Sequence, residues 1–283
     1  MFMRVVSLTA ILSLGLLLFL AGPLAAAPKA EPWPRWEQFD PASRRVLDHS
    51  PWRQFLNRYL LRIGDAPNRM RYGAVDLTGK KTLGAYVAWL SRIPVRRLNK
   101  REQRAYWINF YNALTVKVVL DHYPVASIRD ISISPGWFAK GPWGKKLVEV
   151  ENTPISLDDI EHRILRPIWK DARLHYVLNC AAIGCPELMG EPFTSFNTER
   201  LMQKATLNFV AHSRGMRFEG DELVVSSLYR WYGDDFGGWP EGVLHHLIKF
   251  APQATARRLA TRAVIADHTY DWALNDAATL LKR

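Results

Sequence analysis

The stretch REQRAYWINFYNALTVKVVLDHY, residues 101–123, decides the fold of this chain. Apolar residues occupy nearly every side of the helix that it would form, so it predicts a long buried helix over residues 99–123 that ends before Pro124. Asn109 and Asn112 fall on one stripe of that helix. Buried amides need hydrogen-bond partners, so these two either fix a neighbouring loop or orient a catalytic side chain or a substrate.

Shorter patterns surround this helix. Amphipathic spacing predicts helices over residues 44–63 and 84–90, and β-type runs predict strands over residues 147–150, 175–179 and 222–226. Helices outnumber strands, and the content of 11 Trp suits a substantial core. The sequence therefore predicts an α+β fold: one helix-rich domain over residues 36–283 with a small β-sheet, preceded by an Ala/Pro-rich tether at residues 28–35.

The N-terminus has the pattern of a secretory signal peptide over residues 1–27. Arg4 is followed by an apolar run over residues 5–20 and a small-residue end that allows cleavage after Ala26 or Ala27, and an uncleaved membrane anchor is the alternative. We expect a periplasmic or secreted protein in an oxidising compartment.

The net charge of +11 is scattered over the chain. We therefore expect a cell-envelope ligand or peptide as partner, an anionic one included, no nucleic acid, and membrane contact only through an uncleaved signal segment.

The segment PISLDDIEHRILRP, residues 154–167, predicts a short helix with Ser156 as its N-cap and Pro167 as its end. Glu161 falls inside the apolar stripe of that helix, His162 lies on the flank, and Arg166 points away. A carboxylate on the core side should be buried and hydrogen-bonded.

Both cysteines of the chain lie in LHYVLNCAAIGCPEL, residues 174–188. Cys180 would end the predicted strand, and Cys185 would lie in a loop shaped by Gly184 and Pro186. A Cys180–Cys185 disulfide is one interpretation, since the separation allows it if the loop folds back. A reactive thiol is the other. The C-x4-C spacing is a weak zinc signal, and we expect neither a metal nor another cofactor.

A thiol nucleophile needs an imidazole as proton acceptor and a third group that orients the imidazole. His175 and His162 are the candidate imidazoles, and Cys185 is the preferred nucleophile because its Gly-Cys-Pro loop should be exposed. The candidate orienting groups are Glu161, Asp235, Asn109 and Asn179.

Five motifs in order resemble the family catalogued as domain of unknown function 547. They are YWINFYNALTVK, ISLDDIEHRILRP, HYVLNCAAIGCPEL, WYGDDF and YDWALND, and they extend from about residue 101 to residue 276. The resemblance implies one domain and no defined activity, and it draws attention to Asn109, Asn112, Glu161, His162, Arg166, His175, Asn179, Cys180, Cys185 and Asp235. The chain departs from the expected pattern at Ala181, where the family places glycine after the first cysteine, and this departure argues against a role that needs positive φ there.

Two hypotheses of function follow. The first is a thiol-dependent hydrolase or transferase that acts on amide or ester bonds of the envelope. The second is a noncatalytic envelope-binding module, in which the disulfide shapes a loop and the aromatic residues of GWFAKGPWGKK, residues 136–146, contact a ligand. A thiol redox protein is disfavoured because catalytic dithiols have tighter C-x-x-C spacing.

Overall fold

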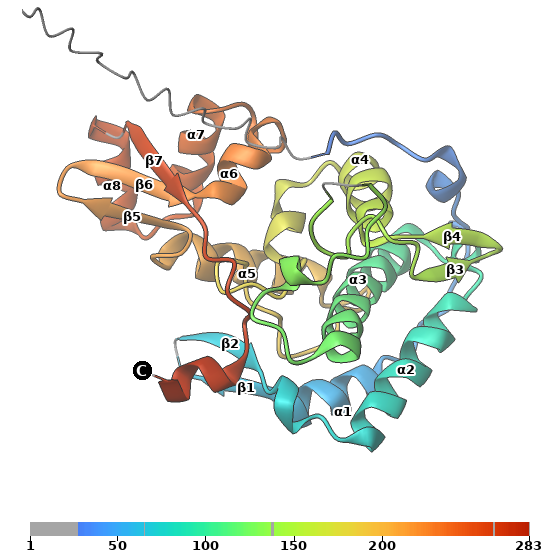
Figure 1. Ribbon diagram of the computed structural model, residues 1–283. Helices are drawn as coiled ribbons and strands as arrows, with labels where there is room; N and C mark the ends of the chain where they lie inside the picture. Colours follow the sequence, from blue (N-terminus) through green and yellow to red (C-terminus); the bar gives the residue numbers. More distant parts are fainter. Residues whose placement is uncertain (1–27, 65, 137–138, 263, 283) are drawn as a thin grey trace, which may run out of the picture.

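The computed structural model describes residues 28–64, 66–136, 139–262 and 264–282 (Figure 1). The predicted signal peptide, residues 1–27, lies outside the described residues. The longer helices are α1 (Ser50–Tyr59), α2 (Leu77–Ser91), α3 (Lys100–His122), α5 (Thr198–Ala211), α7 (Glu241–Phe250) and α8 (Gln253–Arg262). The short ones include α4 (Arg166–Trp169), α6 (Ser227–Trp231) and 3-10 helices at Ala172–Tyr176 and Gly233–Phe236.

Helix α3 is the central element, as the sequence predicts. The Asn99 side chain caps its first turn by accepting a hydrogen bond from the Glu102 amide. Figure 1 shows α1 and α2 on one side of α3, and the C-terminal strands with α6, α7 and α8 at the other end of the molecule. Because α3 is covered by other elements on nearly every side, its Trp107 and Phe110 are fully buried.

The strands form three small sheets. Antiparallel pairs join β1 (Leu60–Ile63) to β2 (Ala66–Met70) and β3 (Val148–Val150) to β4 (Thr153–Ile155). The third sheet has the order β5 (Met216–Glu219), β6 (Glu222–Ser226), β7 (Ile265–Thr269), with β7 parallel to β6. Buried apolar residues from Trp36 to Leu274 form one continuous core. The prediction of a helix-rich α+β domain with small sheets is confirmed.

One predicted helix is shorter than expected, and one predicted strand does not form. The helix expected over residues 44–63 extends only from Ser50 to Tyr59, and Leu60–Ile63 form strand β1. The strand expected over residues 175–179 does not form: Ala172–Tyr176 is a 3-10 helix that begins with the Asp171 side chain accepting a bond from the Arg173 amide. Beyond it, the Asn112 side chain takes the backbone bonds that a neighbouring strand would otherwise make.

Among residues 28–64, 66–136, 139–262 and 264–282, no helix is both long enough and apolar enough to cross a lipid bilayer.

Candidate functional site

A pocket of about 590 Å³ brings the sequence-predicted residues Glu161, His162, His175, Cys180 and Cys185 together. Glu161 and His162 come from the helix that precedes α4, His175 from the 3-10 helix Ala172–Tyr176, and the two cysteines from the segment after that helix. The remaining wall is rich in aromatic rings, at Trp143, Trp231, Tyr232, Tyr270 and Trp272. An apolar cavity with a few convergent polar groups is the usual form of a small-molecule or active site.

The helix that carries Glu161 is a π-helix over Asp159–Leu165, which continues into α4. Ser156 is its predicted cap, and its hydroxyl accepts a bond from the Asp159 amide. The prediction that Pro167 ends the helix is wrong, because the helix continues to Trp169. In this π register the Arg166 amide bonds the Glu161 carbonyl, one residue farther back than in an α-helix.

The N-terminal segment supplies the donors that Pro167 lacks. In the π register the His162 carbonyl would face the nitrogen of Pro167, which carries no hydrogen. The Glu31 amide donates to that carbonyl at 3.0 Å, and the Trp33 amide donates to the Arg163 carbonyl at 3.0 Å. Residues 28–35, expected to be a tether, thus lie against the helix of the site.

Arg166 corrects a second expectation about this helix. It was expected to point away from the apolar stripe, yet only 8% of the residue is exposed. The wider π turn displaces residues after Glu161 around the axis, which turns Arg166 inward. Its guanidinium donates twice to Asp235 and once to the Pro28 carbonyl. It also donates to His162 Nδ1 at 3.0 Å, so that nitrogen carries no proton.

Glu161 is buried and hydrogen-bonded, as its place in the apolar stripe predicts. Its exposed fraction is 8%, and the Tyr111 hydroxyl donates to Oε2 at 3.1 Å. His175 Nδ1 lies 3.8 Å from Oε1, and His162 Nδ1 lies 4.0 Å from the same oxygen. Burial lowers the pKa of His162, in keeping with a neutral ring beside the Arg166 guanidinium. The carboxylate thus stands between two imidazoles.

His175 is held by the other predicted carboxylate. Its Nε2 lies 2.7 Å from Asp235 Oδ2, and its ring stacks on Tyr232 with centroids 4.1 Å apart. Burial alone would raise the pKa of Asp235, but hydrogen bonds from His175 and Arg166 hold it well below its usual range. An ionised Asp235 orients the imidazole and leaves Nδ1 on the side of Glu161.

Cys180 is the more accessible thiol of the site. It is partly exposed, whereas Cys185 is 3% exposed, so the preference for Cys185 as the reachable sulfur is corrected. Three donors surround the Cys180 sulfur: the Cys185 thiol, the Tyr270 hydroxyl at 3.1 Å and the Ala182 amide. The Cys185 bond contributes most to lowering the pKa of Cys180, against the opposing effect of burial.

Cys185 has the opposite character. Burial raises the pKa of its thiol well above the ordinary value, and its sulfur accepts a bond from the Cys180 amide at 2.9 Å. Both cysteines are free thiols, so the Cys180–Cys185 disulfide of the alternative interpretation is not formed in this structure. The two sulfurs therefore differ in character: Cys185 remains protonated, and its single hydrogen is within reach of both Cys180 and the Leu178 carbonyl, which lies 3.6 Å from its sulfur.

The three asparagines position the backbone of the site. Asn112 bonds the Val177 carbonyl and the Asn179 amide, and Asn179 bonds the Pro186 carbonyl and the Ala181 amide. The Asn109 amide group bonds both backbone groups of Phe193. In the described chain these side chains do not line the pocket. Asn112 and Asn179 fix the loop that carries Cys180 and Cys185, and Asn109 fixes the later segment at Phe193, so the two helix amides of α3 hold neighbouring loops in place.

Ala181 has a φ of 61° although it is not glycine. The departure from the family pattern therefore does not prevent the left-handed conformation at this position. Its amide donates to Asn179 Oδ1 at 3.1 Å, and its carbonyl accepts from the Asn275 amide at 2.9 Å. These bonds hold Ala181 in a conformation that costs an L-residue about 1–2 kcal/mol.

Several groups of the site were missed in the sequence. Tyr111, Tyr232 and Tyr270 contact Glu161 or Cys180, and nothing in their spacing indicates this. Asp158 also lines the pocket, and burial raises its pKa to about 7. The carboxylates Glu161 and Asp159 add to that shift. Such a group exchanges a proton near neutral pH.

Comparison with known families assigns the central part of the chain. Residues 95–210 match the family model described as "Protein of unknown function, DUF547". The matched range covers α3, the π-helix and both cysteines, and so confirms the resemblance read from the motifs. No curated protein and no solved structure matches the chain. The described residues hold no group of three or more His, Cys, Asp or Glu side chains arranged for a metal ion.

Proposed function

We propose that this protein is a thiol-dependent hydrolase or transferase that acts on amide or ester bonds of cell-envelope molecules, with Cys180 as nucleophile. The observation that carries the proposal is the environment of the Cys180 sulfur: a partly exposed thiol with a lowered pKa, in a pocket that also holds His175. The thiolate is the reactive form of cysteine, and three donors favour it here. The assignment to envelope substrates depends on the predicted signal peptide.

The chemistry begins with attack of the Cys180 thiolate on the carbonyl carbon of the substrate. A carbon–sulfur bond forms, the carbonyl electron pair moves to oxygen, and the intermediate then expels an amine or an alcohol that must gain a proton. Water or a second nucleophile cleaves the thioester, loses a proton to the site, and regenerates the thiolate.

Two groups in the pocket suit the proton transfers. His175 is oriented through Nε2 by Asp235, and its Nδ1 accepts no hydrogen bond from the described residues. Asp158 titrates near neutral pH, since its pKa is about 7. In this structure His175 makes no hydrogen bond to either sulfur within the described ranges. Thiolate formation therefore depends on Tyr270, Cys185 and the Ala182 amide, and His175 serves the leaving group or the attacking water.

Alkylation and acylation of the native protein test the proposal. Iodoacetamide near pH 7 should modify Cys180 faster than Cys185, and p-nitrophenyl acetate should leave one acetyl group on Cys180, both read by mass spectrometry of peptides. Cys180→Ser should abolish the adduct, whereas the buried Cys185→Ser should retain it at a lower rate. His175→Gln should slow hydrolysis of the acetyl group on Cys180. No acetyl adduct on Cys180, or preferential labelling of Cys185, would contradict the assignment of the nucleophile.

The aromatic wall favours a noncatalytic binding module as the second candidate. Trp231, Tyr270 and Trp272 pack against one another, with Trp231 and Tyr270 centroids 4.8 Å apart, and they remain partly exposed toward the pocket. A binding module would bind its ligand with the same affinity after Cys180→Ser and would form no acyl adduct. An enzyme would lose turnover in that variant, and measurements of binding and turnover on one variant therefore separate the two functions.

A further inference from the structure

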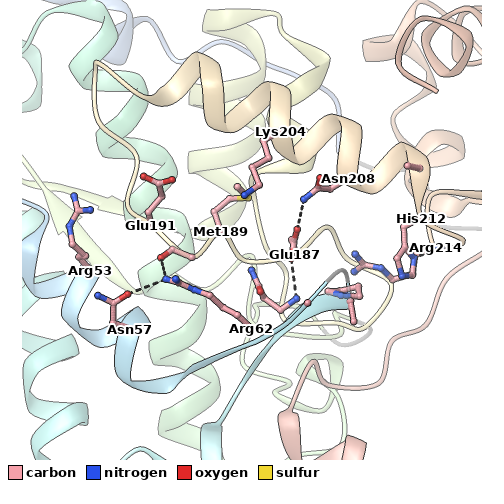
Figure 2. Close-up of a pocket in the computed structure, with 16 residues that line it drawn as sticks. Arg53, Asn57, Arg62, Glu187, Met189, Glu191, Lys204, Asn208, His212 and Arg214 are labelled. Atoms are coloured by element: carbon pink, nitrogen blue, oxygen red, sulfur yellow. Dashed lines mark hydrogen bonds between the residues drawn. The ribbon is translucent and has the colours of Figure 1, made fainter. Parts of the chain in front are cut away.

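A second pocket lies on the other side of the loop that carries the two cysteines. It has a volume of about 770 Å³ and is formed by α1, the β1–β2 hairpin, residues 187–191 and α5 (Figure 2). Figure 2 shows Lys204 reaching in from α5 while Arg62 approaches from the hairpin on the opposite side. Cys185 lines the thiol pocket and Glu187 lines this one, so a single short loop separates the two cavities.

The charged groups of this pocket do not balance. Arg53, Arg62, Lys204 and Arg214 line it, against the two carboxylates of Glu187 and Glu191. No carboxylate of the described chain forms an ion pair with any of the four cations. Burial lowers the pKa of His212, which leaves that ring neutral at pH 7. The pocket therefore has an excess of two positive charges.

Both carboxylates are already occupied. Glu187 accepts bonds from the Asn68 amide at 3.0 Å and from the Asn208 side chain at 2.9 Å. Glu191 forms an ion pair with Arg200 at 3.0 Å. Because their oxygens already have donors, the two carboxylates make no ion pair with the four cations, and the excess of two positive charges remains for a ligand.

Two of the guanidinium groups are fixed in place. Arg62 donates to Asn57 and to the Gly190 carbonyl, and a methyl group at Gly190 would lie 2.6 Å from Arg62 Nε. Glycine is thus what allows the close approach of this guanidinium. Arg214 donates to the carbonyls of Ile183 and Cys185, while its buried Nε has no partner in the described chain. A pre-positioned guanidinium loses less conformational freedom when it binds an anion.

We infer that this pocket binds a phosphate-bearing ligand. A phosphate monoester carries nearly two negative charges at neutral pH, which matches the excess of two positive charges, whereas a single carboxylate would neutralise only one. Guanidinium groups donate to phosphate oxygens in pairs, and Lys204 adds a point charge. Two sources present this chemistry, a soluble phosphate monoester and a phospholipid whose headgroup is itself a phosphate monoester. The inference stands apart from the thiol chemistry.

Calorimetric titration of the full chain with inorganic phosphate at low ionic strength tests this site. The exposed double variant Arg62→Gln/Lys204→Gln should bind phosphate at least about tenfold more weakly than the wild type. The matched control Lys249→Gln/Arg257→Gln removes the same charge from α7 and α8 and should stay within about twofold of wild type. Circular dichroism of each variant checks that the fold is retained.

Vesicles distinguish the two sources of phosphate. Sedimentation with phosphatidic acid vesicles that is lost in Arg62→Gln/Lys204→Gln, but not in the control variant, identifies a lipid headgroup. Phosphate binding without sedimentation identifies a soluble ester. Absence of both phosphate and vesicle binding by the wild type overturns the inference, and so does an equal loss of phosphate or vesicle binding in the pocket variant and the control.

Discussion

The hydroxyl of Tyr270 lies 3.1 Å from the sulfur of Cys180, although the two residues are 90 positions apart in the chain. Tyr270 follows strand β7, and Trp231 and Trp272 pack against its ring. Burial raises the pKa of Tyr270 well above its ordinary value, so the phenol remains protonated and donates when Cys180 is a thiolate. This contact joins the C-terminal segment to the reacting atom of the proposed site.

Replacement of that phenol tests its effect on the thiol. Tyr270→Phe removes one donor to the sulfur, so the pKa of Cys180 should rise. A hydrogen bond is worth about 0.5–1.5 kcal/mol, and alkylation of Cys180 near pH 7 should slow about two- to tenfold. The pH dependence of the iodoacetamide rate measures the shift directly, because its midpoint should move to higher pH.

Tyr123→Phe is the matched control for this experiment. The Tyr123 hydroxyl donates to Asp276 at 2.8 Å and has no contact with either sulfur in the described chain. Its loss should leave the alkylation profile unchanged. An unchanged profile in Tyr270→Phe as well would show that Tyr270 does not stabilise the thiolate.

Local sequence patterns predicted those helices and strands whose buried residues recur at a regular spacing along the chain. Residues 101–123 are apolar on nearly every side, and α3 forms over Lys100–His122 with Asn99 as its cap. The β-type run ELVVS predicted strand β6 with the bounds that the structure shows. The burial of Glu161 also followed from its place in one helical stripe, since that stripe is a local property.

Contacts between distant residues were not predictable in the same way. HYVLN alternates like a strand, but the Asp171 cap and the Asn112 side chain impose another backbone. Arg166 was expected to point away because a step of about 100° assumes an α-helix, and the π register changes that angle. The exposure of Cys180 relative to Cys185 depends on Tyr270 and on loop packing, which no local pattern encodes.

Glu161 should contribute to stability through its buried hydrogen bonds. Glu161→Ala leaves the buried Tyr111 hydroxyl without its acceptor and should lower the free energy of unfolding by about 1–3 kcal/mol. Glu161→Gln keeps an acceptor of the same size and should lose less. Urea denaturation measures both. The exposed Glu149→Ala should change the free energy by no more than about 0.5 kcal/mol, and an equally small change in Glu161→Ala would contradict this role.

Asp158 should make stability depend on pH. Its pKa is raised from 3.8 to about 7, chiefly by burial, so folding favours its protonated form. That contribution is fully present below pH 3.8 and is lost as the pH rises through about 7. Asp158→Asn should therefore raise the melting temperature relative to wild type more at pH 8 than at pH 5. The gain should stay below about 1 kcal/mol, because 39% of the side chain is exposed and solvent screens it. Thermal unfolding of both proteins at the two pH values measures it, and an equal difference at both pH values would contradict the raised pKa.

The N-terminal segment should stabilise the π-helix through its backbone. Glu31→Pro removes the amide that donates to the His162 carbonyl, and neither Pro167 nor the α4 helix can replace that donor. The free energy of unfolding should fall by about 0.5–1.5 kcal/mol, as measured by urea denaturation. Glu31→Ala keeps the amide and removes only an exposed side chain, so it should stay within about 0.5 kcal/mol of wild type.

Because Pro28 lines the thiol pocket and bonds Arg166, Glu31→Pro should also change the rate at which Cys180 is alkylated, whereas Glu31→Ala should not. Equal stability of the two variants would show that the His162 carbonyl does not need this donor.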